Sequence, residues 1–223
     1  MPAPSVIAHI AVWSQLLPAT VVAAKQGWNL RPRLWTGLAL LSSTVGDGVQ
    51  FVLGRRGLSN LWIGYVSTAI TGILIVTALA EWQVTGRSRQ TMWLALILYV
   101  IMWGTTMLFE ETARFSLLAV PIHSVLVLLL SLWTLMSNAL KDRPQPTYRY
   151  DWFWACLGLA LLYGASSAMQ PLLRILIAEG QMNDAIAVLN FKAGFQVVAM
   201  LFITAGMLCP VQAHSGFSSL PVR

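Results

Sequence analysis

The stretch 6–57 reads VIAHIAVWSQLLPATVVAA, then KQGWNLRPR, then LWTGLALLSSTVGDGVQFVL, then GRRG, and this alternation decides the fold. A helix of about 20 apolar residues is long enough to cross the ~30 Å hydrocarbon core of a bilayer. Two such segments follow each other here, separated by a short basic loop. The same alternation continues to the end of the chain. We therefore predict membrane-spanning helices near 5–24, 34–53, 61–80, 92–109, 115–137, 152–173 and 185–208.

The composition supports this interpretation. Hydrophobic residues make up 57% of the 223 residues and charged residues only 10%, whereas soluble domains carry about 25% charged residues. We predict an all-α integral membrane protein with one seven-helix transmembrane domain over 1–209, followed by a short disordered cytoplasmic tail over 210–223. Because Glu110 and Glu111 end the fourth segment abruptly, six spans with a re-entrant segment remain an alternative.

The basic residues predict the orientation of the bundle. Loops 25–33, 81–91 and 138–151, together with the C-terminal tail, hold nine Lys and Arg residues, and the other loops hold four. Positively charged short loops stay on the cytoplasmic side. We therefore expect the N-terminus outside the cell and the C-terminus in the cytoplasm. The membrane is expected to be the inner membrane of a bacterium. The net charge of +6 follows from this bias and indicates contact with the lipid bilayer, not with nucleic acid.

A short sequence repeat indicates an internal duplication. The segment GLALL occurs at 37–41 and again at 158–162, each time after a tryptophan and a basic loop. Gly72 and Gly194 follow at a similar offset. The two copies would run in the same direction, which gives a parallel repeat of three helices, one linker helix and three helices. Some transporters are built from parallel repeats.

Three titratable residues lie at the same predicted depth. Asp47, Lys192 and His123 fall on three different spans, each six to eight residues from the outer end, which is about 9–12 Å at 1.5 Å per residue. Ionisable groups inside a bilayer cost free energy and mark candidate functional sites. We predict that they line an outward-facing polar pocket for a small molecule, in which Asp47 and Lys192 approach within salt-bridge distance and neutralise each other. Glu110 and Glu111 would form an acidic mouth, and His9 would be a further member.

Residues near these three could shape the predicted pocket or add hydrogen-bonding groups to it. Gly46 and Gly48 flank Asp47 and would permit close helix approach or local unwinding. Hydrogen-bonding groups are expected from a further set: Ser42, Ser43, Thr44, Asn190 and Gln196. The structural alternative is that an Asp47–Lys192 ion pair simply joins two helices, while His123 satisfies a carbonyl freed by Pro121.

The chain carries no enzyme or metal motif: HExxH, CxxC and GxSxG are all missing from the sequence. A membrane-embedded hydrolase would require His123 to act with Glu110 or Glu111, so we lean against an enzyme. We predict binding or transport of a small molecule, with a non-catalytic sensory or structural membrane subunit as the alternative. No metal site and no oligomeric state are predicted.

Two family resemblances complete the sequence-based expectations. Lys192-Ala193-Gly194-Phe195 in the last span resembles the retinal-binding lysine region of microbial rhodopsins, which implies retinal on Lys192 with Asp47 as counterion. The segment 61–80, however, lacks the charged pattern that those proteins carry on their third helix. The three-plus-one-plus-three layout, with Gln15-Leu16-Leu17-Pro18, resembles PQ-loop and SWEET-type transporters, although residues 18–19 read Pro-Ala where those carry Pro-Gln.

Overall fold

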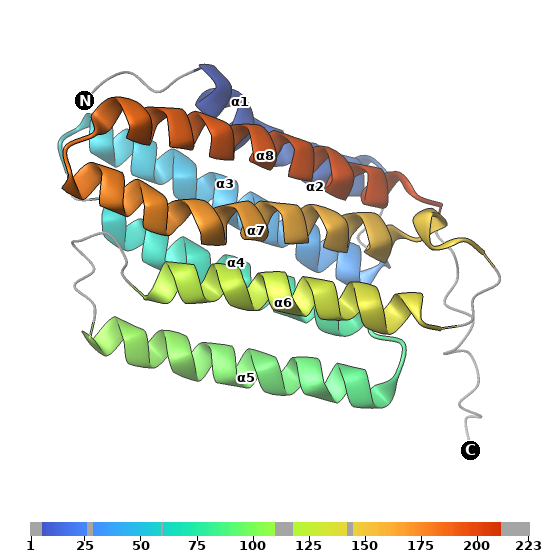
Figure 1. Cartoon of the computed structure of the whole chain (residues 1–223). Helices are drawn as coiled ribbons and strands as arrows, with labels where there is room; N and C mark the ends of the chain where they lie inside the picture. Colours follow the sequence, from blue (N-terminus) through green and yellow to red (C-terminus); the bar gives the residue numbers. More distant parts are fainter. Residues whose placement is uncertain (1–5, 26–28, 59, 110–117, 142–144, 211–223) are drawn as a thin grey trace.

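The computed structural model describes residues 6–25, 29–58, 60–109, 118–141 and 145–210, and the regular elements of these ranges are all helical. Their bounds are α1 Val6–Ser14, α2 Leu16–Ala24, α3 Arg31–Arg55, α4 Leu61–Glu81, α5 Gly86–Phe109, α6 Ala119–Ala139, α7 Asp151–Ala178 and α8 Met182–Leu208, with a 3-10 turn η2 at Thr147–Arg149. The long helices lie side by side in one bundle (Figure 1). Each predicted span overlaps one of these helices, with α1 and α2 sharing the first.

Six of these segments are long and apolar enough to cross a membrane, with α1 and α2 counted together as Val6–Ala24. The fourth predicted span, α5, is one of them and runs for 24 residues, because the helix begins at Gly86 within the basic loop. The 25-residue α3 does not reach the same hydropathy, since Asp47 and Gln50 lie within its apolar stretch. The chain is therefore a helical, multi-pass membrane protein whose most polar long helix is α3.

The first span is interrupted at Gln15, between α1 and α2. Pro18 has no N–H, so it cannot donate to the carbonyl four residues earlier, at Ser14. The Gln15 N–H instead donates to the Val12 carbonyl, 3.3 Å away, in a tighter turn. The predicted span over 5–24 is present as one apolar segment, Val6–Ala24, and the turn at Gln15 places a polar side chain in the middle of it.

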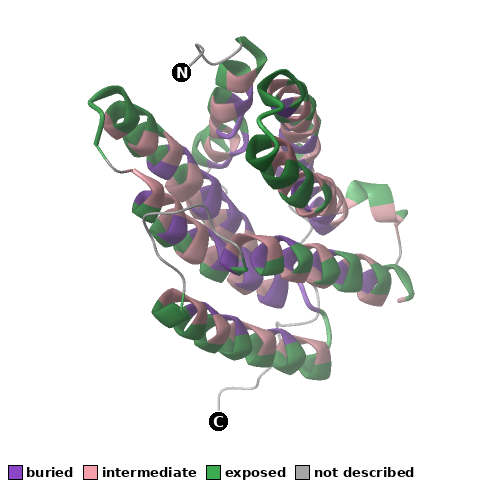
Figure 2. Ribbon diagram, turned by 60° about the vertical axis from the view of Figure 1, so that its left-hand side comes forward, coloured by how far each residue is buried: buried purple, intermediate pink, exposed green. Residues whose placement is uncertain are grey.

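Six segments form a closed ring, and α5 lies outside it. In chain order α1/α2, α3, α4, α6, α7 and α8 each contact the next, and α8 returns to α1 and α2. The fifth helix packs against α4 and α6 and forms the lower edge of the bundle in Figure 1. Leu94, Ile97, Leu98 and Ile101 of α5 are 56–58% exposed, as expected for side chains that face lipid. Figure 2 shows the exposed residues on the outside of the helices and the buried ones between them.

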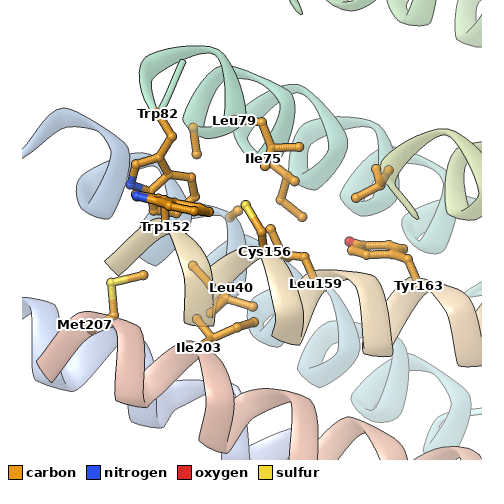
Figure 3. Close-up of a cluster of buried hydrophobic side chains, with 14 of the residues drawn as sticks. Leu40, Ile75, Leu79, Trp82, Trp152, Cys156, Leu159, Tyr163, Ile203 and Met207 are labelled. Atoms are coloured by element: carbon orange, nitrogen blue, oxygen red, sulfur yellow. The ribbon is translucent and has the colours of Figure 1, made fainter. Parts of the chain in front are cut away.

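Following the predicted orientation, we call the end with Arg55, Asn60 and Met182 the outer end, and the end with Arg33, Glu81 and Asp151 the inner end. The main apolar cluster fills the inner half. Figure 3 shows the indoles of Trp82 and Trp152 side by side at one end of this cluster and Tyr163 at the other. Both indoles are 1% exposed. The inner half is therefore closed by packed side chains.

Glycines allow α7 and α8 to approach closely within this inner half. A Cβ on Gly158 would lie 2.7 Å from the Ala199 carbonyl oxygen, and one on Gly206 would lie 2.8 Å from the Asp151 carbonyl oxygen. The two GLALL segments nevertheless pack differently, because Gly37 faces Val22 of α2 while Gly158 faces α8. The helix order is compatible with a parallel repeat, but these two glycines do not have equivalent neighbours.

Candidate functional site

A cavity of about 210 Å³ lies in the outer half of the ring. A single water needs about 10–15 Å³ by the same kind of measure, so the cavity has room for many waters or one small solute. Side chains from α3, α4, α6, α7 and α8, together with Gln15, form its wall. The polar members are Gln15, Ser43, Asp47, Gln50, Ser67, Thr68, Thr71, His123, Ser124, Tyr163, Ser166, Gln170, Lys192 and Gln196.

The structure brings together the three residues that the sequence placed at one depth. Asp47 of α3, His123 of α6 and Lys192 of α8 all line this cavity. Their depth is set by counting along each helix, but their convergence requires that each side chain also point inward. That requirement is met for all three, whereas their role in binding a ligand stays a prediction.

Asp47 and Lys192 share the cavity without forming a direct ion pair. Among the described residues, the ion pairs at salt-bridge distance are Arg33–Asp151 and Arg89–Glu81, so the sequence-based expectation of an Asp47–Lys192 contact is wrong. Asp47 Oδ2 instead accepts a hydrogen bond of 3.0 Å from Gln15 Nε2. The two charges still attract each other through space. Lys192 has no hydrogen-bond partner within the described ranges, and its charge faces the cavity.

His123 is held in an aromatic pocket at the cavity wall. Its ring centroid lies 5.1 Å from that of Tyr163, 5.6 Å from that of Tyr99 and 6.3 Å from that of Trp103. A Cβ on Gly72 would lie 2.8 Å from His123 Cε1, so the glycine makes room for the imidazole. The side chain is 2% exposed.

The Nδ1 atom of His123 has no hydrogen-bond partner in the described part of the chain. The carbonyl that Pro121 would free is that of residue 117, which lies outside the described residues, so the structural alternative for His123 stays a prediction. Pro121 lies in the first turn of α6, where a backbone N–H has no helical partner in any case. A buried polar atom without a partner calls for an explanation. Ser131 Oγ, Asn138 Oδ1 and Trp82 Nε1 in the inner half are in the same state, but His123 belongs to the wall of the cavity.

Gln170 of the neighbouring helix α7 also has a buried polar atom without a partner in the described part of the chain. Its Oε1 atom is buried and has no partner among the described residues, and the side chain lines the cavity. Sequence reasoning missed Gln170, and it also missed Gln15 and Ser166. The two glutamines were detectable, because each is a polar residue inside an apolar span close to a proline, Pro171 or Pro18.

The remaining predicted site residues divide into three groups. Ser43 and Gln196 line the cavity as expected. Ser42, Thr44, Asn190 and His9 do not belong to its wall: Thr44 donates to the Leu40 carbonyl, and His9 packs edge-on against Phe51. Glu110 and Glu111, with Arg114, lie outside the described residues.

Gly46 brings α3 and α4 together beside Asp47. A Cβ at this position would collide with the Ser67 side chain, whereas a Cβ on Gly48 would meet nothing within 4 Å. The close-approach prediction is thus confirmed for Gly46. The alternative of local unwinding is wrong, because α3 is continuous from Arg31 to Arg55.

A second buried polar cluster lies at the inner end and was not predicted. Arg33 Nε donates to Asp151 Oδ2 at 3.0 Å, and the same guanidinium donates to the carbonyls of Met207 and Cys209 at 3.2 and 2.9 Å. We call these four residues the Arg33 clamp. It joins α3 to α7 and to the end of α8. From the sequence alone, Arg33 is one of the basic residues of the loop 25–33.

No protein family model, no curated protein and no solved structure matches this chain.

Proposed function

We propose that this membrane protein binds a small polar molecule from the outer side and transports it, with the cavity as its outward-facing binding site. One observation carries the proposal: polar groups from five helices and Gln15 surround a space of about 210 Å³, and two of their buried atoms have no protein partner in the described ranges. Burying unsatisfied polar groups is costly. A polar occupant removes that cost.

The closed inner half supports transport over simple binding. Transporter sites are formed at the interface between two repeats, near the middle of the membrane. Here α1/α2, α3 and α4 form one side of the ring and α6, α7 and α8 the other, and both sides contribute to the cavity. The Arg33 clamp connects the two sides at the inner end. This arrangement is what an outward-facing state would require.

The unpaired charges argue against a purely structural subunit. If Asp47 and Lys192 served only to hold α3 and α8 together, a direct contact would be expected, because a buried charge is stabilised by close pairing and hydrogen bonds. The Arg33 clamp meets that description, and Asp47 with Lys192 does not. The cavity charges are better explained by a ligand that contacts them.

Cysteine labelling tests whether the cavity opens to the outer side. Ser166 lines the cavity, and Ser131 of α6 is fully buried in the inner half and is absent from the cavity wall. In a background with Cys156→Ala and Cys209→Ser, we expect Ser166→Cys to react with a small membrane-impermeant methanethiosulfonate applied to intact cells. Ser131→Cys is the matched control and should remain unmodified.

Two results would contradict the proposal. Equal labelling of both cysteines would indicate general unfolding and not a cavity. Labelling of Ser166→Cys only from the cytoplasmic side would reverse the orientation derived from the basic loops.

A further inference from the structure

Two formal charges of opposite sign face the cavity from different helices, Asp47 from α3 and Lys192 from α8, and no other formally charged residue of the described ranges lines it. Asp47 keeps one hydrogen bond, from Gln15, and Lys192 keeps none to the described residues. Each charge is therefore available to a ligand, while the pair as a whole leaves the cavity neutral.

The charge of the ligand follows from this arrangement. A simple cation would neutralise Asp47 and leave Lys192 with an added like charge nearby, and a simple anion would do the reverse. A charge without a partner in a low-dielectric site is costly. A molecule that carries both a cationic and an anionic group satisfies Asp47 and Lys192 together and keeps the site neutral.

The rest of the wall limits the size and the polarity of such a ligand. About 210 Å³ admits a solute with a few to roughly ten non-hydrogen atoms, when compared with pockets of ~300–1,000 Å³ that hold drug-sized molecules. The amides of Gln50, Gln170 and Gln196 and the hydroxyls of Ser166 and Tyr163 offer hydrogen bonds. Gln170 Oε1 requires a donor, which an ammonium group supplies.

We infer that the cavity recognises a small zwitterion of the α-amino acid class, with its ammonium group toward Asp47 and its carboxylate toward Lys192. This inference rests on the proposed function, because it names the solute of that same cavity. Charged hydrogen bonds to both ends of the ligand would also distinguish it from singly charged molecules of the same size.

The decisive experiment compares matched ligands on the unmodified protein. Purified protein in detergent is titrated with glycine, L-alanine, L-serine and L-glutamine, and binding is measured by calorimetry and by the rise in Tm. Propionate is alanine without its ammonium group, and ethylamine is alanine without its carboxylate. We expect at least one of the amino acids to bind, and the corresponding singly charged analogues to bind roughly tenfold more weakly or worse, as for other truncated buried charge pairs.

Two variants then test whether Asp47 and Lys192 bind the two charged groups of the ligand. Asp47→Asn and Lys192→Met should each weaken amino acid binding by roughly tenfold or more. Glu81→Gln is the matched control, because it also neutralises one carboxylate of a bonded pair, Glu81–Arg89, but lies at the inner end outside the cavity. It should bind the amino acid as the unmodified protein does.

Three outcomes would overturn the inference. Propionate or ethylamine binding as tightly as alanine would show that one charge is enough, and it would leave the proposed binding function intact. Failure of all four amino acids to bind would reject the zwitterion, while the labelling of Ser166→Cys decides separately whether the cavity is open. Equal loss of binding in Glu81→Gln would show that the effect of the cavity variants is not local.

Discussion

The inner and outer halves of this bundle both contain charged side chains between the helices, but among the described residues only those of the inner half are paired with each other. In the inner half Arg33 is 3% exposed and bonds to Asp151 and to two carbonyls at the end of α8. In the outer half Asp47 and Lys192 are partly exposed to a cavity and do not pair directly. The inner charges are bonded to protein groups, whereas the outer charges face a space that water or a ligand can occupy.

This difference separates a structural role from a binding role. A buried ion pair is tolerated when its geometry is close and its remaining donors are bonded, and breaking it leaves an uncompensated charge. Charges around an open cavity can be solvated by water when no ligand is present. Stability should therefore depend strongly on the Arg33 clamp and weakly on Asp47 and Lys192, whereas ligand binding should show the opposite dependence.

The largest loss of stability is expected for Arg33→Met. The substitution leaves Asp151 and the carbonyls of Met207 and Cys209 without the guanidinium donor, at a cost of about 3–5 kcal/mol, which corresponds to a fall in Tm on the order of 10 °C for a chain of this size. Tm in detergent measures it. Arg31→Met, two residues earlier in α3 at an exposed position, is the control and should leave Tm nearly unchanged. Equal Tm values for the two variants would contradict the prediction that the clamp stabilises the fold.

An intermediate effect is expected for Gly46→Ala. The added Cβ would collide with Ser67 and push α3 and α4 apart, which costs about 1–3 kcal/mol for an overpacked site. Gly48→Ala adds the same methyl group where nothing lies within 4 Å, and it should be neutral or slightly stabilising because alanine favours helix. A comparison of Tm for the two variants tests this close approach, and a larger loss for Gly48→Ala would contradict it.

The smallest loss of stability is expected for the cavity charges. Asp47→Asn retains an oxygen for the Gln15 donor, and Lys192→Met removes a charge that has no direct protein partner in the described ranges. Each should cost only about 1 kcal/mol or less, because water in the unliganded cavity solvates the charge that remains. A double-mutant cycle on Tm in the unliganded protein measures their coupling, which should be weak. A coupling as large as the effect of Arg33→Met would mean that the two residues form a structural pair after all.

Much of the site was accessible from the sequence, and the reason is geometric. A helix rises 1.5 Å per residue, so counting from the ends of the spans fixes the depth of Asp47, His123 and Lys192. The direction in which each side chain points is not fixed in the same way. In a membrane the outer faces of the helices are as apolar as the core, so the pattern of apolar residues gives little information about which face turns inward.

The sequence by itself determined the helical, multi-pass membrane fold and the positions of Asp47, His123 and Lys192 along their helices, because apolar length and position along a helix are local properties. It also indicated Gly46 as a point of close approach. Only the tertiary structure decided which helices are neighbours, that Gln15 reaches Asp47 through the break before Pro18, and that Arg33 belongs to a buried clamp and not to a solvated loop. Those features depend on contacts between residues 32 to 176 positions apart, and such contacts are set by how the helices pack against one another.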